Sequence, residues 1–305
     1  MSLGLLALLA SLAALSWWLW TPDKDAAWLR GKYLANRADL IEVAGTTLHV
    51  RDTGPRQAPA VILIHGFGSS LQTWDAWAKA LEAEHRVIRF DLPGSGLSLP
   101  DASGHYTDGR SIELLMALQD RLNVPRASIV GHSIGGRIAW TFAAQQPQRV
   151  DKLVLVAPDG FTSPGFAYGV APKVPTALGL MRFALPKSLL RMNLAPAYAD
   201  PAFLTDALTT RYHDLLLAPG ARQALLMRMQ QTVLVDPVPL LKSIHAPTLL
   251  VWGEQDAMIP LVNSADYLKA MPQARLTAIA RVGHLPQEEA AERAIDAVST
   301  FLKGP

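Results

Sequence analysis

The sequence contains no cysteine, which excludes disulfide bonds, thiolate nucleophiles and zinc–sulfur sites. A strong excess of one charge is also lacking, because 28 basic residues stand against 26 acidic ones and the formal net charge is +2. The basic residues are scattered along the chain and form no basic stripe of the kind that nucleic-acid binders carry. We therefore expect no nucleic-acid partner. The absence of cysteine is compatible with either side of a bacterial membrane.

Charge is missing altogether from the N-terminal run, residues 2–20, which reads SLGLLALLASLAALSWWLW. As a helix this run would span roughly 28 Å, close to the hydrocarbon thickness of a bilayer. Its end carries Trp17, Trp18 and Trp20, and such rings favour the headgroup level. A cleaved signal peptide is the alternative, but no basic residue precedes the run and bulky residues close it. The sequence predicts a single-pass transmembrane anchor over residues 1–20, in a bacterial inner membrane.

The segment after this anchor, residues 21–38, has the pattern of an amphipathic helix. We expect Thr21 as its N-cap and Pro22 as its first helical residue. It is expected to lie along the membrane surface, the alternative being a linker helix packed on the following domain. Small residues recur on one face of the anchor, which suggests a homodimer formed through it.

From residue 39 onward, buried apolar runs alternate with helical patterns. This alternation predicts an α/β fold with a mostly parallel sheet and helices on both faces. The expected strands are 40–45, 46–54, 60–66, 86–94, 127–131, 152–158, 247–253 and 274–280. The expected helices are 71–83, 111–123, a helix after Ser133, and 287–302.

The alternation breaks at residues 159–235, which are rich in proline, leucine, alanine and methionine. This stretch is predicted to be a helical cap inserted between two parts of one core, residues 39–158 and 236–305. In α/β sheets, ligands bind at the carboxyl ends of the strands, where such a cap would sit.

One serine stands between glycines in GHSIG, residues 131–135, after a buried strand and before a helix. This is the G-x-S-x-G pattern of a nucleophile on a sharp turn, so we expect Ser133 to be the nucleophile. A serine hydroxyl needs a base, and His284 follows the last strand. The base needs a carboxylate, for which Asp256 is expected and Asp159 is the competing acid.

Two backbone amides are expected to stabilise the oxyanion, those of Phe67 and Ile134. Phe67 belongs to the turn HGFG, residues 65–68, and Ile134 follows the nucleophile. Asp91 lies in another turn and is expected to be structural. The chemistry needs no metal ion and no organic cofactor.

Five motifs, HGFGSS, DLPGSGLS, GHSIGG, GEQDAMIP and GHLPQEE, occur in the order and at the spacings of the α/β-hydrolase superfamily. The chain resembles this superfamily over residues 45–303. With its anchor and cap it is similar to monoacylglycerol lipases and to bacterial membrane-anchored phospholipases A. Serine at the nucleophile position argues against haloalkane dehalogenases and epoxide hydrolases, which carry aspartate there. Ring-cleavage C–C hydrolases share the serine, aspartate and histidine pattern.

The expected activity is therefore cleavage of lipid carboxylic esters through an acyl-serine, as in phospholipases A, lysophospholipases or monoacylglycerol lipases. The partners are a lipid ester, its fatty acid product and membrane lipids. Flexible thioethers suit variable acyl chains, so Met181, Met192 and Met258 are expected to contact the substrate, although ordinary packing is an alternative. Two other hypotheses are a small-molecule hydrolase of esters or C–C bonds and a non-catalytic binding module. The positive-inside rule for basic residues beside an anchor favours a cytoplasmic domain. The resemblance to bacterial phospholipases A favours a periplasmic domain, which we expect.

Overall fold

The computed structural model describes residues 4, 5, 11, 17, 19–162 and 167–304. Its centre is an eight-stranded sheet with the strand order β1-β2-β4-β3-β5-β6-β7-β8. β1 and β2 form an antiparallel hairpin, β2 pairs antiparallel with β4, and the remaining neighbours are parallel. The strands are β1 (Leu40–Val43), β2 (Thr46–Thr53), β3 (Ala60–Ile64), β4 (Arg86–Phe90), β5 (Ala127–His132), β6 (Val150–Val156), β7 (Thr248–Gly253) and β8 (Arg275–Ile279). The predicted mostly parallel sheet is confirmed.

Helices cover both faces of the sheet, because successive strand residues point to opposite sides and both sides are apolar. In β3, Ile62 and Ile64 face one cluster, whereas Val61 and Leu63 face the other. The first cluster includes side chains of α4 (Asp108–Arg121), α5 (Ile134–Gln145), α9 (Val238–Lys242) and α10 (Ser264–Ala270). The second includes those of α3 (Asp75–Leu81) and α12 (Ala291–Lys303).

Three predicted helix boundaries differ from the observed ones. The helix expected over 71–83 is a 3-10 turn, Leu71–Trp74, followed by α3. α4 starts before residue 111, because the Thr107 hydroxyl caps it by accepting from the Arg110 amide. The helix expected over 287–302 is divided at Ala290, where φ is −139°, into α11 (Pro286–Glu289) and α12.

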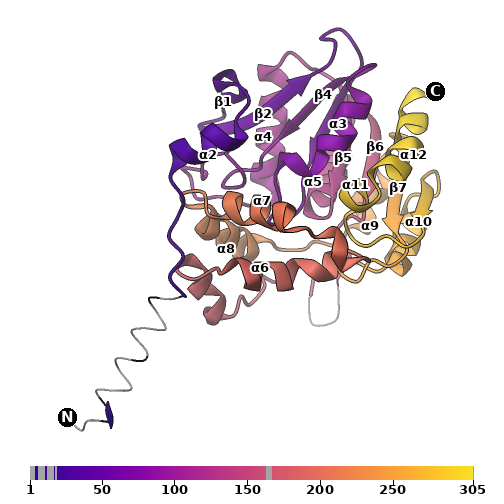
Figure 1. The fold of residues 1–305 in the computed structure, drawn as a ribbon. Coiled ribbons are helices and arrows are strands. Elements are labelled where there is room, and N and C mark those ends of the chain that lie inside the picture. Colours follow the sequence, from indigo (N-terminus) through magenta and orange to yellow (C-terminus); the bar gives the residue numbers. More distant parts are fainter. Residues whose placement is uncertain (1–3, 6–10, 12–16, 18, 163–166, 305) are drawn as a thin grey trace.

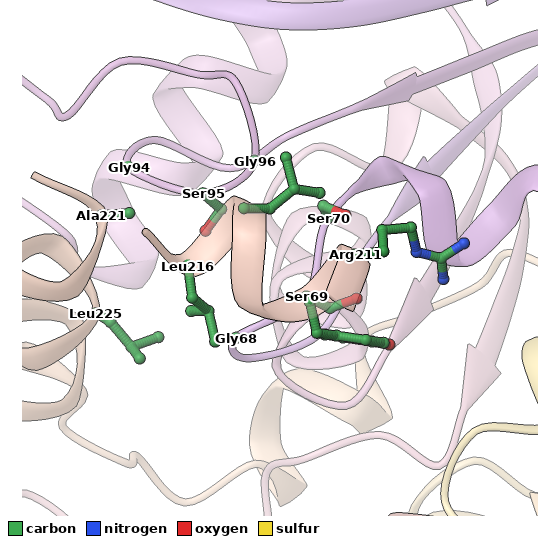
Figure 2. A pocket seen from close by; sticks show the side chains of 12 residues that line it. Gly68, Ser69, Ser70, Gly94, Ser95, Gly96, Arg211, Leu216, Ala221 and Leu225 are labelled. Carbon is green, nitrogen blue, oxygen red and sulfur yellow. The ribbon is translucent and has the colours of Figure 1, made fainter. Parts of the chain in front are cut away.

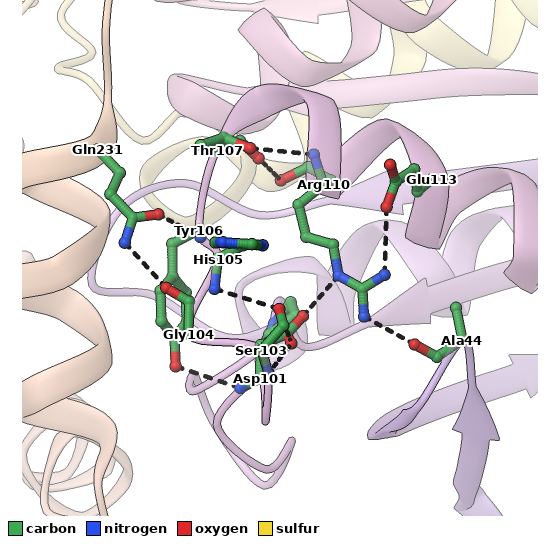
Figure 3. Close-up of polar contacts among 12 residues, drawn as sticks. Ala44, Asp101, Ser103, Gly104, His105, Tyr106, Thr107, Arg110, Glu113 and Gln231 are labelled. Atoms are coloured by element: carbon green, nitrogen blue, oxygen red, sulfur yellow. Dashed lines mark hydrogen bonds and ion pairs between the residues drawn. The ribbon is translucent and has the colours of Figure 1, made fainter.

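The segment between β6 and α9 forms the cap, a helical layer outside the sheet (Figure 1). Its described helices are a 3-10 helix (Thr176–Arg182), α6 (Lys187–Leu194), two 3-10 turns (Ala195–Ala197 and Pro201–Phe203), α7 (Asp206–Leu216) and α8 (Ala221–Gln231). α7 closes onto the core turns 68–70 and 94–96 and leaves a space of only about 10 Å³, from which Arg211 points away (Figure 2). At the end of α8, Gln231 accepts from the Tyr106 amide and donates to the Gly104 carbonyl (Figure 3). The cap thus packs on the core through α7 and is hydrogen-bonded to it at the end of α8.

Among the described residues, no helix is long and apolar enough to cross a membrane. Most of the anchor expected over residues 1–20 lies outside the described residues. The helix expected from Pro22 is α2 (Ala26–Tyr33), and its N-cap is Asp25, which accepts from the Trp28 amide. The expectation for Thr21 was wrong because its hydroxyl instead accepts from the Leu185 amide of the cap, at 3.1 Å.

α2 packs on the domain, which is the alternative considered above for this helix. Its Leu29 is buried beside Leu97 and Leu215. The buried carboxylate of Asp214, on α7, binds three side chains from the N-terminal segment, at 2.6 to 2.7 Å: Lys24, Lys32 and Tyr33. These three contacts attach the N-terminal segment to the cap, and we call them the clasp at Asp214.

Acidification is expected to release this clasp. Burial alone would raise the pKa of Asp214, but its bonds to Lys24, Lys32 and Tyr33 outweigh burial and lower the pKa. Ionised Asp214 therefore stabilises the docked segment above about pH 4, the ordinary range of an aspartate, and this stability is lost as the pH falls through the lowered pKa. The hydrogen-exchange protection of the amides of residues 24–33 should therefore decrease as the pH falls through this range.

The Asp214→Asn variant tests this cause. It should lower the free energy of local opening by about 1.5–3 kcal/mol at pH 7, the usual size of a hydrogen bond to a charged group, and flatten the pH dependence. Asp206→Asn, on the same helix but exposed and paired with Lys187, is the matched control. Equal protection in the Asp214→Asn variant and the wild type would contradict the assignment.

Candidate active site

Ser133 occupies a strained turn between β5 and α5. Its backbone has φ 54° and ψ −121°, a conformation that residues with a side chain rarely adopt. The flanking glycines permit the turn because a Cβ on Gly131 would lie 2.2 Å from the Gly135 carbonyl oxygen. A Cβ on Gly135 would lie 2.4 Å from the Ile64 carbonyl oxygen. The spacing of glycines around the serine is thus explained by close approach of the turn to itself and to β3.

His284 and Asp256 form a hydrogen-bonded pair. The distance from His284 Nδ1 to Asp256 Oδ2 is 2.8 Å, and both side chains are buried. The other carboxylate oxygen accepts from the amides of Met258 and Ile259, both at 2.8 Å. Because a carboxylate only accepts, Nδ1 carries the proton and Nε2 is left as a base. The structure therefore brings together the predicted base and the predicted orienting acid.

The competing acid, Asp159, has another partner. Its carboxylate is paired with the buried guanidinium of Arg137, which also binds Asp108 at 2.9 Å. Asp159 lies past the end of β6, at the same edge of the sheet as Asp256, so sequence position alone did not separate the two. The contact with His284 identifies Asp256 as the candidate triad acid.

No hydrogen bond joins Ser133 Oγ to His284 within the described part of the chain. Contacts between nucleophile and base are often long before substrate binds. The residue directly before Ser133, His132, contacts the base: its ring lies 4.6 Å from that of His284, and its Nε2 bonds the His284 carbonyl oxygen at 2.8 Å.

The contact of His132 with His284 was not predicted from the sequence. Burial, together with the neighbouring His284, lowers the pKa of His132 well below its ordinary value, so its ring is neutral at pH 7. It supports the carbonyl of the base without adding charge beside it. Its place directly before the nucleophile was visible in the sequence, but the direction of its side chain was not.

The two expected oxyanion amides are available. Among the turn and loop hydrogen bonds of the described residues, neither the Phe67 nor the Ile134 amide donates. Ile134 is the first residue of α5, so its amide has no partner within the helix and carries the positive end of the helix dipole. Both residues line the same cavity, which joins these donors to a space for substrate.

That cavity has a volume of about 450 Å³ and is mostly apolar. It lies between the oxyanion turn and the cap, and its lining consists of Phe67, Ile134, Asp159, Phe161, Ala167, Val170, Pro172, Lys173, Val174, Pro175, Met229, Thr232 and Leu234. Ser133, Asp256 and His284 line neither this cavity nor a larger open depression of about 760 Å³ beside β7, β8 and α12, but this cavity is lined by both expected oxyanion residues. The apolar cavity is therefore the candidate substrate site.

The expected substrate methionines are not in it. Met192 and Met258 are 66% and 55% exposed, and Met181 is half-buried outside the cavity lining. Met258 contacts the candidate catalytic acid through its backbone amide, which donates to Asp256. Met229 lines the cavity instead. Methionine content indicated the cap but not which side chains face inward, because that depends on how the helices dock.

Arg228, on α8, is a second residue near the site that was not predicted from the sequence. It is buried, and with Gly66, Phe67 and Ile134 it lines a narrow space behind the oxyanion turn. Among the described residues no carboxylate pairs with it, and burial lowers its pKa to about 10. It remains charged at pH 7, and a cation there favours negative charge at the turn. The described residues contain no cluster of side chains suited to a metal ion.

Comparison with known proteins agrees with this geometry. A family model described as the alpha/beta hydrolase fold matches residues 59–291. A 2-hydroxy-6-oxononadienedioate/2-hydroxy-6-oxononatrienedioate hydrolase of Cupriavidus pinatubonensis is 32% identical over 267 residues, covering 84% of this chain and 90% of that protein.

Two solved structures bear on the lipase resemblance. A candidate lipase from Acinetobacter baumannii AYE has a TM-score of 0.74 at 26% identity, covering 92% of this chain and 97% of that one. A membrane phospholipase A, a bacterial virulence factor, has a TM-score of 0.75 at 23% identity, covering 99% and 97%. At that identity the second similarity shows the fold alone.

Proposed function

This chain belongs to the α/β-hydrolase family and is a hydrolase, and from that premise we propose that it cleaves carboxylic esters of lipids. The proposed substrates are those of phospholipases A, lysophospholipases or monoacylglycerol lipases. The observation that carries the proposal is the apolar cavity of about 450 Å³ between the oxyanion amides and the cap. An acyl chain bound there gains free energy from burial along its length.

The proposed reaction proceeds through an acyl-serine. Ser133 Oγ attacks the ester carbonyl while His284 Nε2 takes its proton, and the amides of Phe67 and Ile134 bind the oxyanion. The tetrahedral intermediate expels the alcohol, which receives the proton from His284. Water then attacks the acyl-serine with His284 again as base, releasing the fatty acid and restoring Ser133. Asp256 keeps the proton of the imidazole on Nδ1 throughout.

The cap surface supports a membrane location. Trp20, at the end of the uncharged N-terminal run, stacks on Phe183 with ring centroids 5.9 Å apart. Leu180, beside Phe183, is 64% exposed, and the cations Arg182 and Lys187 lie next to these apolar side chains in the sequence. Such a surface fits an interface with anionic lipid headgroups. We propose a single-pass anchor, a periplasmic catalytic domain and a homodimer through the anchor.

A second candidate is hydrolysis of C–C bonds in ring-cleavage products. Curated relatives of 30–32% identity are named as hydrolases of 2-hydroxy-6-oxo dienoates and dienedioates. Those substrates carry carboxylates, which need a cation. Lys173, in the cavity lining, is exposed, and Arg137 is already paired with two aspartates. Buried Arg228, behind the oxyanion turn, is the cation that would hold such a carboxylate. The lipid ester is preferred on the apolar lining of the cavity itself.

The test is fatty-acid release from a long-chain glycerophospholipid in mixed micelles. Short-chain esters and a ring-cleavage dienoate are assayed in parallel, each with wild type and Ser133→Ala. Release by the wild type alone supports the lipid proposal. Turnover of the dienoate without fatty-acid release supports the second candidate. Equal release by both proteins would contradict the assignment of Ser133.

Narrowing the cavity should change acyl-chain preference. Met229→Trp is expected to reduce activity on palmitoyl esters about tenfold or more while butyryl esters keep activity within about twofold. The reason is that only the long chain reaches the filled volume, and an oversized side chain in a packed site costs about 1–3 kcal/mol. The measurement is kcat/KM across a series of chain lengths.

Met192→Trp is the matched control, because Met192 is exposed and outside the cavity. It should leave the chain-length profile unchanged. A uniform loss across all chain lengths in the Met229→Trp variant would mean that the acyl chain does not occupy this cavity.

A further inference from the structure

Two neighbouring carboxylates at the end of α11 bind the cap, and one of them, Glu289, also binds the loop of the candidate catalytic histidine. Glu289 accepts from the amide of Gly283 at 2.7 Å and from the amides of Ala199 and Asp200, in the cap, at 3.1 and 2.8 Å. One carboxylate thus bonds both the residue directly before His284 and two successive residues of the cap. These are charge-assisted bonds to backbone amides, the stronger class of hydrogen bond.

Glu288 binds different cap groups. It accepts from the hydroxyls of Tyr198 and Tyr212 at 2.6 and 3.0 Å, and from Arg211 at 2.8 Å. These contacts attach α7 and the preceding loop to α11. None of these three side chains belongs to the loop that carries His284. Glu288 therefore binds only the cap, whereas Glu289 binds both the cap and this histidine loop.

The histidine loop also bonds the cap directly. The His284 amide donates to the Ala197 carbonyl oxygen at 2.7 Å. The approach is so close that a Cβ on Gly283 would lie 2.6 Å from the same oxygen. The backbone around the base therefore rests on the cap segment 197–200 and not only on the sheet.

We infer that Glu289 is a positioning residue for His284, and that the base is held in its working place only while the cap segment 197–200 is seated on it. The Glu289 carboxylate touches neither the imidazole nor the substrate cavity. It acts by fixing the backbone from which the imidazole projects. A displacement of about 1 Å at a catalytic group can lower the rate on the order of 100-fold. The inference requires His284 as the base, whatever the substrate.

The test uses the full-length protein and two readouts. The first is the rate at which a fluorophosphonate probe labels Ser133, which needs the base but no knowledge of the natural substrate. The second is the measurement of kcat and KM as separate constants with a short ester. Glu289→Ala is expected to lower the labelling rate and kcat about 10- to 100-fold with KM within about twofold. Glu289→Gln retains an acceptor oxygen and is expected to lose about three- to tenfold.

Gln231→Ala is the matched control. Gln231 also bonds the cap to the core, at Gly104 and Tyr106, but makes no contact with the histidine loop (Figure 3). It should leave the labelling rate within about twofold of wild type. A loss in Gln231→Ala equal to that in Glu289→Ala would overturn the inference, because general loosening of the cap would then explain both.

A Glu289→Ala variant with the same labelling rate and kcat as the wild type would also overturn the inference. If Glu289→Ala does not fold, as judged by circular dichroism, Glu289→Gln carries the same test, and an unchanged kcat in that variant overturns the inference. Failure of the probe to label wild-type Ser133 would contradict the triad itself, whereas labelling without fatty-acid release would contradict only the lipid proposal.

Discussion

Ser133→Ala is expected to lower turnover at least about 10⁴-fold without loss of the fold, because the nucleophile of the acyl-enzyme is removed. The hydroxyl makes no hydrogen bond within the described part of the chain, so its loss leaves no buried partner unsatisfied. The measurement is ester turnover with the melting temperature as a check on folding. A loss below about 100-fold would mean that another residue carries the chemistry.

Ser133→Gly sharpens this prediction. The positive φ at position 133 strains any residue with a Cβ, and such strain costs about 1–3 kcal/mol. Glycine relieves it, so the glycine variant should melt at least as high as the alanine variant and be equally inactive. A variant that is both more stable and inactive would show that the strained turn serves catalysis rather than folding.

Asp256→Asn is expected to lower kcat about 10⁴-fold. One carboxylate oxygen accepts from two backbone amides, so the carboxamide oxygen must stay there and the NH₂ group must face His284. Nδ1 must then accept a hydrogen bond, which moves the imidazole proton to Nε2 and removes the base. The variant should fold normally, because the two backbone bonds persist. Turnover is again the measurement.

Asp159→Asn tests which of the two candidate acids, Asp159 or Asp256, orients His284. It weakens the pairing of buried Arg137, so it should lower the free energy of unfolding by about 1–3 kcal/mol and activity by at most about tenfold. If Asp159→Asn loses as much activity as Asp256→Asn, the pairing seen between His284 and Asp256 does not define the catalytic acid.

The sheet, the turn at Ser133 and the pairing of His284 with Asp256 were predictable from sequence patterns. Each core strand is a buried apolar run, and the polar residue after it necessarily lies at the carboxyl edge. The order of Ser133, Asp256 and His284 along the chain then selected among many serines, acids and histidines. The glycines at positions 131 and 135 had the predicted steric role.

What the sequence did not reveal depends on contacts between distant segments. Residues 287–302 consist largely of good helix formers, yet the helix breaks at Ala290, next to Glu289 and its bonds to Gly283, Ala199 and Asp200. Met181 and Met192 lie outside the apolar cavity for a similar reason, since the orientation of cap helices is set by docking. Arg228 comes to line the space behind the oxyanion turn only after α8 is placed there.

The clasp at Asp214 also determines how short a stable form of this protein can be. A protein that began at Leu40 would keep every strand of the sheet, but it would lose Lys24, Lys32 and Tyr33. A buried carboxylate without its partners costs about 3–5 kcal/mol, a large share of the roughly 5–15 kcal/mol that holds a typical domain together. Arg222 also donates to the Thr21 carbonyl oxygen at 2.7 Å. A shortened form made for crystallisation should therefore start no later than Thr21, or replace Asp214 by an uncharged residue.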